Sequence, residues 1–500
     1  MIQVHLALLL CPQLPDFEPR FELGQRVRAL EREFLEQPEQ GPRRRELIDA
    51  AERAVERFFR GDFAAAAQAF DGALGWPPGA GWVLLPQRRL VPAEAEGLDL
   101  WLWRWYGPEQ PRPAALELSV GEHWQALEAL PEQAVGMRRA WRARLPLEAL
   151  PGGDQRLRLR VRFEPGNGSS PGPDEPAGSA ADFERASPAA GERNSASEEP
   201  RSLWLSVVPD LEPRLAALEA GAATLGPQAP ALEAATLAGH LELLRQLASG
   251  PAGETEFPAA RLLEEAEALL DCALRGRPWL TSQRSGEHWI SVPTGKRPTR
   301  VRLWLPPDLG AEAGPGRPLV LALHGAGGSE NLFFDGHGDG LIRRLCAERG
   351  WILAAPRLGL LGGGAPELLP AALAERLPID LTRVFVVGHS MGAARALSLA
   401  REAPGLAAAL VLLGGGRPLR DPEALRQLPI WIAAGERDFG RPGAEALQAS
   451  LARAAAQPTA ADLARPHELW IVPQVEHLLV VPAALPRAFA WLDARAPRQR

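Results

Sequence analysis

The chain has 500 residues, 46% of them apolar, and its 62 acidic and 55 basic residues leave a net charge of −7. This length predicts two or three domains, because one hydrophobic core stops growing at ~250–300 residues. The scattered, balanced charges argue against a nucleic-acid partner, the three widely spaced cysteines against a disulfide framework, and the lack of an apolar run of ~18 residues against a membrane span.

The N-terminus leaves the localisation open. Residues 4–11 form a short apolar run followed by Pro12, which is typical of a signal-peptide core. A charged segment before it and a small-residue cleavage site after it are both missing. The sequence therefore supports export and a cytoplasmic location equally.

Residues 1–79 are predicted to form a helical segment. Apolar residues recur at helical spacing over 43–76, and Gly61-Asp62 marks a turn between two helices. The stretch that begins at this turn resembles part of a tetratricopeptide repeat. Only one copy is visible, and stacked repeats need about three, so a plain helical hairpin is favoured.

Residues 80–210 change to short β-like runs separated by proline and glycine, which predicts a small β-sandwich-like module. The predicted strands are 83–85, 98–105, 115–120, 140–145, 157–163 and 203–208. Residues 164–200, between the last two strands, are rich in Gly, Pro, Ser, Ala and Glu. Such a composition buries too little apolar surface to fold, so a disordered insertion is predicted there.

Trp101, Trp103 and Trp105 alternate along one predicted strand and so share one face of it. One interpretation is a stacking platform through which this module contacts polysaccharide. The favoured interpretation is the core of the sandwich, because large aromatic side chains usually supply buried area.

Residues 211–283 are predicted to be a helical connector, and residues 284–500 a catalytic domain in which strands and helices alternate. Alternation of this kind predicts a parallel sheet with helices on both faces. The predicted strands of this domain are 288–292, 301–305, 319–323, 351–355, 384–387, 409–413, 430–434 and 469–472.

The most informative motif is Gly388-His389-Ser390-Met391-Gly392, which follows the fifth of these strands and precedes an Ala/Leu-rich helical stretch. A serine on a tight turn between strand and helix is a nucleophile candidate, and the flanking glycines allow the close approach. Ser170 lies in a second copy of the five-residue pattern, but no strand leads into it and no helix follows. Ser390 is therefore the candidate, and Ser170 is not.

With eight strands and the nucleophile after the fifth, residues 285–495 resemble the α/β-hydrolase superfamily. The resemblance implies a doubly wound, mostly parallel eight-stranded sheet and a triad in the order serine, acid, histidine. His477 then matches the histidine and Asp438 the acid, because both follow predicted strands. Glu436 and Glu476 are rivals for the acid.

The resemblance also places an oxyanion hole. The segment 324–328 resembles the HGGG-type loop of esterases, so the backbone N–H groups of Ala326 and Met391 are the expected donors. His324 and His389 are expected to be structural supports rather than bases.

The segment 335–340, with sequence DGHGDG, raises the possibility of a calcium loop. Its twelfth position is Cys346, where a bidentate glutamate is needed, so no metal site is predicted. We expect this region to line the substrate entrance, with Gly327, Asn331, Phe333 and Phe334 as substrate-binding residues. No cofactor is predicted.

The sequence therefore predicts a serine hydrolase that cleaves carboxylic esters through an acyl-enzyme. It resembles the carboxylesterase, feruloyl-esterase and polyhydroxybutyrate-depolymerase branches, which implies a small-molecule or polymer-linked ester as substrate. The alternatives are a serine peptidase of the prolyl-oligopeptidase type and a binding protein with a vestigial hydrolase domain. Only a short stretch separates the strands at 409–413 and 430–434, so we expect no large cap and an open cleft.

Overall fold

The computed structural model describes residues 19–75, 81–107, 113–120, 123–127, 133–135, 138–148, 150–163, 202–250, 257–295, 297–310, 316–359, 365–455 and 467–495. The predicted signal-like segment and the predicted disordered insertion at 164–200 lie outside these residues. No helix in the described ranges is both long enough and apolar enough to cross a bilayer.

Three helices begin the described chain: α2 (Pro19–Glu36), α3 (Pro42–Phe59) and α4 (Phe63–Ala73). The predicted hairpin is α3 and α4, and Asp62 caps α4 by accepting a hydrogen bond from the Ala65 N–H. We refer to α2, α3 and α4 together as the N-terminal helices.

Two sheets follow, and they share one apolar core. One has the order β1-β3-β7-β6 and the other β2-β9-β8-β4-β5. Leucines from both sheets, such as Leu100 and Leu205, lie in the same buried cluster, as expected for a sandwich. Their strands are β1 (Trp82–Pro86), β2 (Leu90–Pro92), β3 (Gly97–Arg104), β4 (Pro113–Val120), β5 (His123–Leu127), β6 (Gln133–Val135), β7 (Arg138–Pro146), β8 (Gly153–Phe163) and β9 (Ser202–Val208).

Trp101 and Trp103 are only 4% and 7% exposed, as the core interpretation predicts. They pack with Val83, Leu85 and Ala140 on the face of the β1-β3-β7-β6 sheet that points away from the core shared by the two sheets. Trp105 follows the end of β3 and is half-buried against the same cluster. A sugar platform needs exposed rings, and these three tryptophans do not present a row of them.

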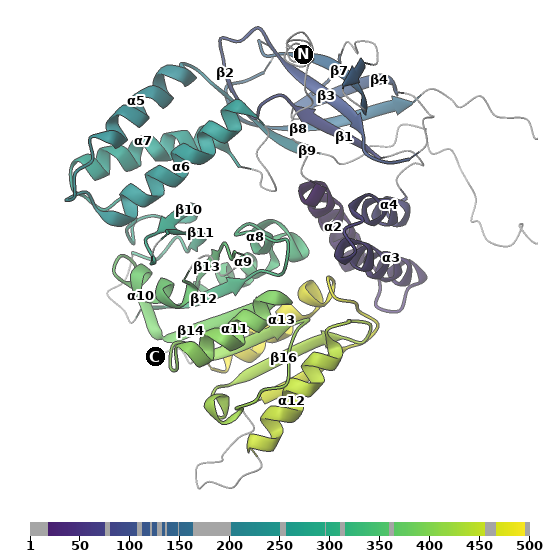
Figure 1. The fold of residues 1–500 in the computed structure, drawn as a ribbon, viewed down its shortest axis with the longest axis vertical. Coiled ribbons are helices and arrows are strands. Elements are labelled where there is room, and N and C mark those ends of the chain that lie inside the picture. The colour runs from purple at the N-terminus through teal and green to yellow at the C-terminus, as the bar shows by residue number, and fades with distance from the viewer. Residues whose placement is uncertain are drawn as a thin grey trace, which may run out of the picture.

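A second group of helices joins the sandwich to the C-terminal sheet: α5 (Leu211–Ala223), α6 (Ala231–Ser249) and α7 (Ala259–Leu274). In Figure 1 they lie on the side of the molecule opposite the N-terminal helices. The residue limits of the four predicted domains stay predictions.

The C-terminal sheet has the strand order β10-β11-β13-β12-β14-β15-β16-β17. β11 runs opposite to the other strands of this sheet, and all eight strands overlap the predicted ones. They are β10 (Gly286–Val292), β11 (Thr299–Leu305), β12 (Arg317–Leu323), β13 (Ile352–Pro356), β14 (Ile379–His389), β15 (Ala409–Leu413), β16 (Ile430–Gly435) and β17 (His467–Val472).

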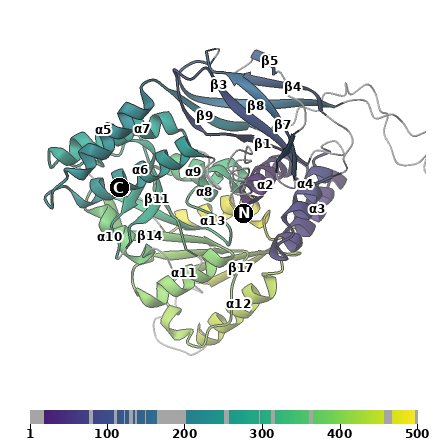
Figure 2. The same cartoon turned by 45° about the horizontal axis from the view of Figure 1, so that its top comes forward.

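Helices cover both faces of this sheet, since successive strand residues point to opposite sides. Val384 and Val386 pack in one cluster with the helices α6, α7, α10, α11 and α12, whereas Phe385 and Val387 pack in another with α9, α13 and the N-terminal helices. The helices of this unit are α8 (Leu332–Asp335), α9 (His337–Arg349), α10 (Leu369–Ala374), α11 (Met391–Glu402), α12 (Arg441–Ala455) and α13 (Val480–Asp493), with short turns η1 (Pro366–Leu368) and η2 (Glu423–Leu425). The N-terminal helices thus share a core with the C-terminal sheet, and they lie beside it in both views (Figures 1 and 2).

Candidate active site

Ser390 stands on a strained turn between β14 and α11, as the sequence predicts. Its backbone angles are φ 55° and ψ −116°, which non-glycine residues rarely adopt. A side chain at Gly392 would place its Cβ 1.9 Å from the carbonyl oxygen of Leu323. Glycine is required there because α11 starts directly against the end of β12.

The structure brings the three predicted triad residues together. The Ser390 Oγ lies 2.9 Å from the His477 Nε2, and the His477 Nδ1 lies 2.8 Å from the Asp438 Oδ1. His477 and Asp438 are each 4% exposed, while Ser390 is half-buried. An imidazole in this position can take the hydroxyl proton during attack, and the carboxylate holds it in the required orientation.

Neither rival acid contacts the imidazole. Glu436 is exposed and accepts a hydrogen bond from the Gln474 N–H. Glu476 is buried and accepts two backbone N–H groups just before α13. The geometry therefore favours Asp438 as the partner of His477.

Glu476 is nevertheless unusual, because burial raises its pKa to about 8, and the carboxyl groups of Asp438 and Glu31 add to the rise. Glu476 therefore keeps its proton in the folded protein over a pH range in which the unfolded chain loses it.

We predict that this proton makes stability depend on pH. The unfolded chain binds fewer protons than the folded chain between pH 4.5, the ordinary value, and about 8. The free energy of unfolding then falls as pH rises through that window, by several kcal/mol at ~1.4 kcal/mol per unit. Glu476→Gln should remove this loss, because one Glu476 oxygen, Oε1, accepts both backbone N–H groups and an amide oxygen can replace it.

Urea unfolding at several pH values between 5 and 8 would measure this dependence, with the exposed Glu436→Gln as the matched control. A wild-type curve parallel to that of Glu476→Gln would contradict the prediction.

The two predicted oxyanion donors, Ala326 and Met391, lie near Ser390. Met391 is the first residue of α11, where helix N–H groups lack partners within the helix. Ala326 lines the cavity at Ser390, in a loop that lies against the nucleophile: a Cβ on Gly325 would be 3.3 Å from the Ser390 Cβ.

His324 and His389 have the surroundings of structural residues. The His324 Nδ1 lies 2.8 Å from the Gly325 carbonyl oxygen, and its Nε2 accepts the Leu358 N–H. The His389 Nε2 lies 3.1 Å from the His477 carbonyl oxygen. Burial lowers the pKa of both rings, so both are neutral and hold backbone in place.

A cavity of about 180 Å³ opens at the triad, and two of the four predicted substrate-binding residues line it, Gly327 and Asn331. Phe333 and Phe334 do not line it, which corrects the prediction for them. They are only 1% and 3% exposed, and they pack into the core beside α9 because burial of an aromatic ring is favourable.

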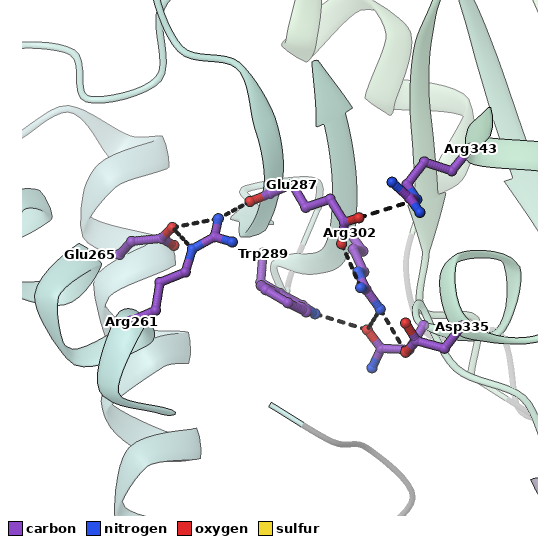
Figure 3. Close-up of polar contacts among 8 residues, drawn as sticks. Arg261, Glu265, Glu287, Trp289, Arg302, Asp335 and Arg343 are labelled. Atoms are coloured by element: carbon purple, nitrogen blue, oxygen red, sulfur yellow. Dashed lines mark hydrogen bonds and ion pairs between the residues drawn. The ribbon is translucent and has the colours of Figure 1, made fainter. Parts of the chain in front are cut away.

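A polar network fixes the part of the cavity lining that Asn331 and Asp335 form (Figure 3). Arg302 of β11 donates to Asn331 and to Asp335, which both line the cavity, and it pairs with Glu287 of β10. Burial alone would lower the pKa of Arg302, but the two carboxylates raise it above its ordinary value. Arg302 therefore stays charged. No sequence motif marks this arginine, because its partners come from distant parts of the chain.

The expectation that no large segment caps the site is wrong. The N-terminal helices cover the site and form one side of the cavity, which Ser390 and His477 line from the other side. Between β15 and β16 lies only the short turn η2, and the covering segment comes from the other end of the chain.

Only one strand, β11, opposes the others in an eight-stranded sheet, the serine turn follows β14, and the acid and histidine follow β16 and β17. The C-terminal unit has the α/β-hydrolase fold. This agrees with the predicted fold class. Among the described residues no group of His, Cys, Asp and Glu could hold a metal ion.

Comparisons with solved structures return enzymes of this fold. An S-formylglutathione hydrolase from Agrobacterium tumefaciens is 17% identical and aligns over 42% of this chain and 95% of its own, with a TM-score of 0.34. A ferulic acid esterase is 15% identical over 42% of this chain and 96% of its own, with a TM-score of 0.35. A thermostable esterase is 13% identical over 82% and 99%, with a TM-score of 0.36. No protein-family model and no curated protein matches the chain.

Proposed function

We propose that the chain is a serine esterase that hydrolyses carboxylic esters through an acyl-enzyme. The observation that carries the proposal is the hydrogen-bonded series from Ser390 through His477 to Asp438, at 2.9 and 2.8 Å. These distances are within the range that proton transfer requires.

In the proposed mechanism the Ser390 Oγ attacks the ester carbonyl carbon while the His477 Nε2 accepts its proton. Asp438 stabilises the imidazolium, and the N–H groups of Ala326 and Met391 receive the developing oxyanion. The tetrahedral intermediate collapses as His477 protonates the leaving alcohol. A water molecule, deprotonated by His477, then attacks the acyl-enzyme. The bond between the acyl carbon and the Ser390 Oγ breaks as His477 returns the proton to Oγ, and the carboxylic acid leaves.

Hydrolysis of p-nitrophenyl esters, with peptide p-nitroanilides on the same plate, tests this proposal. We expect turnover of the esters and little or none of the anilides. Turnover of the anilides alone would establish the peptidase alternative. Folded protein that cleaves neither would establish the vestigial one.

A further inference from the structure

The cavity at Ser390 has an apolar wall that the catalytic unit does not supply. This wall comes from the N-terminal helices, with Phe21, Leu23 and Val27 of α2, Val55 and Phe58 of α3, and Phe70 of α4. Phe58 lies directly over the oxyanion loop, since a Cβ on Gly327 would be 2.9 Å from its ring. A group of the substrate that extends from the ester carbonyl toward these helices therefore meets mainly hydrocarbon, although Arg20 and Arg28 of α2 also line the cavity.

Buried polar contacts hold the N-terminal helices in place. Glu31 of α2 is 0% exposed, and its Oε2 accepts the Gly338 N–H at 3.1 Å. Its Oε1 lies 3.5 Å from the His337 Nδ1. A carboxylate in such a position is not solvated by water, so separation of α2 from the C-terminal unit would break these contacts.

A second attachment lies beside the acid of the triad. Arg437, the residue before Asp438, forms ion pairs with Asp49 and Glu52 of α3. Phe439 follows Asp438, and its ring packs edge-on against the ring of Phe59 of α3, with 5.5 Å between the ring centres. The centre of the Phe439 ring lies 4.1 Å from that of the His477 ring. The N-terminal helices are thus fixed to the loops that carry Asp438 and His477.

We propose that the N-terminal helices are a built-in lid that forms the binding site for an uncharged apolar group of the ester, about the size of a six-carbon chain or ring. The size follows from the 180 Å³ of the cavity, since an apolar cavity of ~150 Å³ holds benzene. The inference rests on the proposed esterase function and adds the substrate class.

Gly24 offers a way to fill this site without disturbing the fold. It lies within α2 and lines the cavity, and a Cβ built on it meets nothing within 4 Å. Leucine is also a better helix former than glycine, so Gly24→Leu should fold. Gly72 of α4 is the matched control, because it is a helical glycine of the same lid with open space around it, and it does not line the cavity.

The test compares kcat/KM for p-nitrophenyl acetate, butanoate, hexanoate and decanoate. We expect kcat/KM to be highest near hexanoate. Gly24→Leu should lower the ratio of kcat/KM for hexanoate to kcat/KM for acetate by about tenfold to a hundredfold. Gly72→Leu should behave as wild type, and Phe58→Ala should shift the optimum to longer chains. Alkyl acetates, measured by acid release, show whether the apolar group belongs to the alcohol instead. A chain-length profile that is the same in wild type and Gly24→Leu in both series would overturn the proposal.

A binding measurement separates this inference from the esterase function. Hexyl methyl ketone carries a six-carbon chain beside a carbonyl and has no bond to hydrolyse. Saturation-transfer NMR should show that it binds wild type and Gly72→Leu but not Gly24→Leu. That result without ester turnover would leave the apolar site standing and the esterase function refuted. Equal binding to all three proteins would refute the site.

Discussion

Replacing Ser390 by alanine is expected to lower kcat for p-nitrophenyl esters by on the order of 10⁶-fold. The rate that remains would come from substrate binding and the oxyanion donors alone. The substitution removes only the Oγ that lies 2.9 Å from the His477 Nε2, so the fold should persist. The measurement is ester turnover with circular dichroism on the same samples.

The chain contains its own control for this variant. Ser170 occupies the same five-residue glycine pattern in another part of the sequence, so Ser170→Ala should retain full activity. Substantial turnover by Ser390→Ala, or an equal loss in Ser170→Ala, would refute Ser390 as the nucleophile.

Asp438→Asn is expected to lower kcat by on the order of 10⁴-fold. The amide keeps the shape of the side chain, but it cannot balance the charge of the imidazolium, and it can reverse the hydrogen bond that orients the ring. Asp438 Oδ1 also accepts the Gly440 N–H at 2.6 Å, and this contact is lost when the amide nitrogen takes that position and donates to the ring.

Glu436→Gln, two residues away and exposed, is the control, and it should change kcat by less than about threefold. A larger loss in Glu436→Gln or Glu476→Gln than in Asp438→Asn would transfer the role of the acid to that residue.

The C-terminal sheet could be predicted from the sequence because its strands are buried on both faces. Such strands are continuous apolar runs, of which Val384 to Val387 is an example, and the nucleophile turn adds a glycine signature. In the sandwich the short strands β2, β5 and β6 escaped prediction, since three to five residues carry little periodicity.

The lid could not be predicted from the sequence. Its helices have ordinary amphipathic patterns, which show that a face is buried but not what covers it. The contact between Glu31 and Gly338 joins positions 307 residues apart, and no local pattern links them. Phe333 and Phe334 illustrate the same limit, because a pair of aromatic residues beside an oxyanion loop is consistent with either a substrate wall or a core.

The mass of the intact chain during turnover of a p-nitrophenyl ester tests the central claim most directly. At a pH low enough to slow deacylation, we expect one acyl group per chain, located by peptide mapping on Ser390, together with a burst of one equivalent of p-nitrophenol. Hydrolysis by folded protein without any adduct on Ser390, or with the acyl group on another residue, would contradict the account.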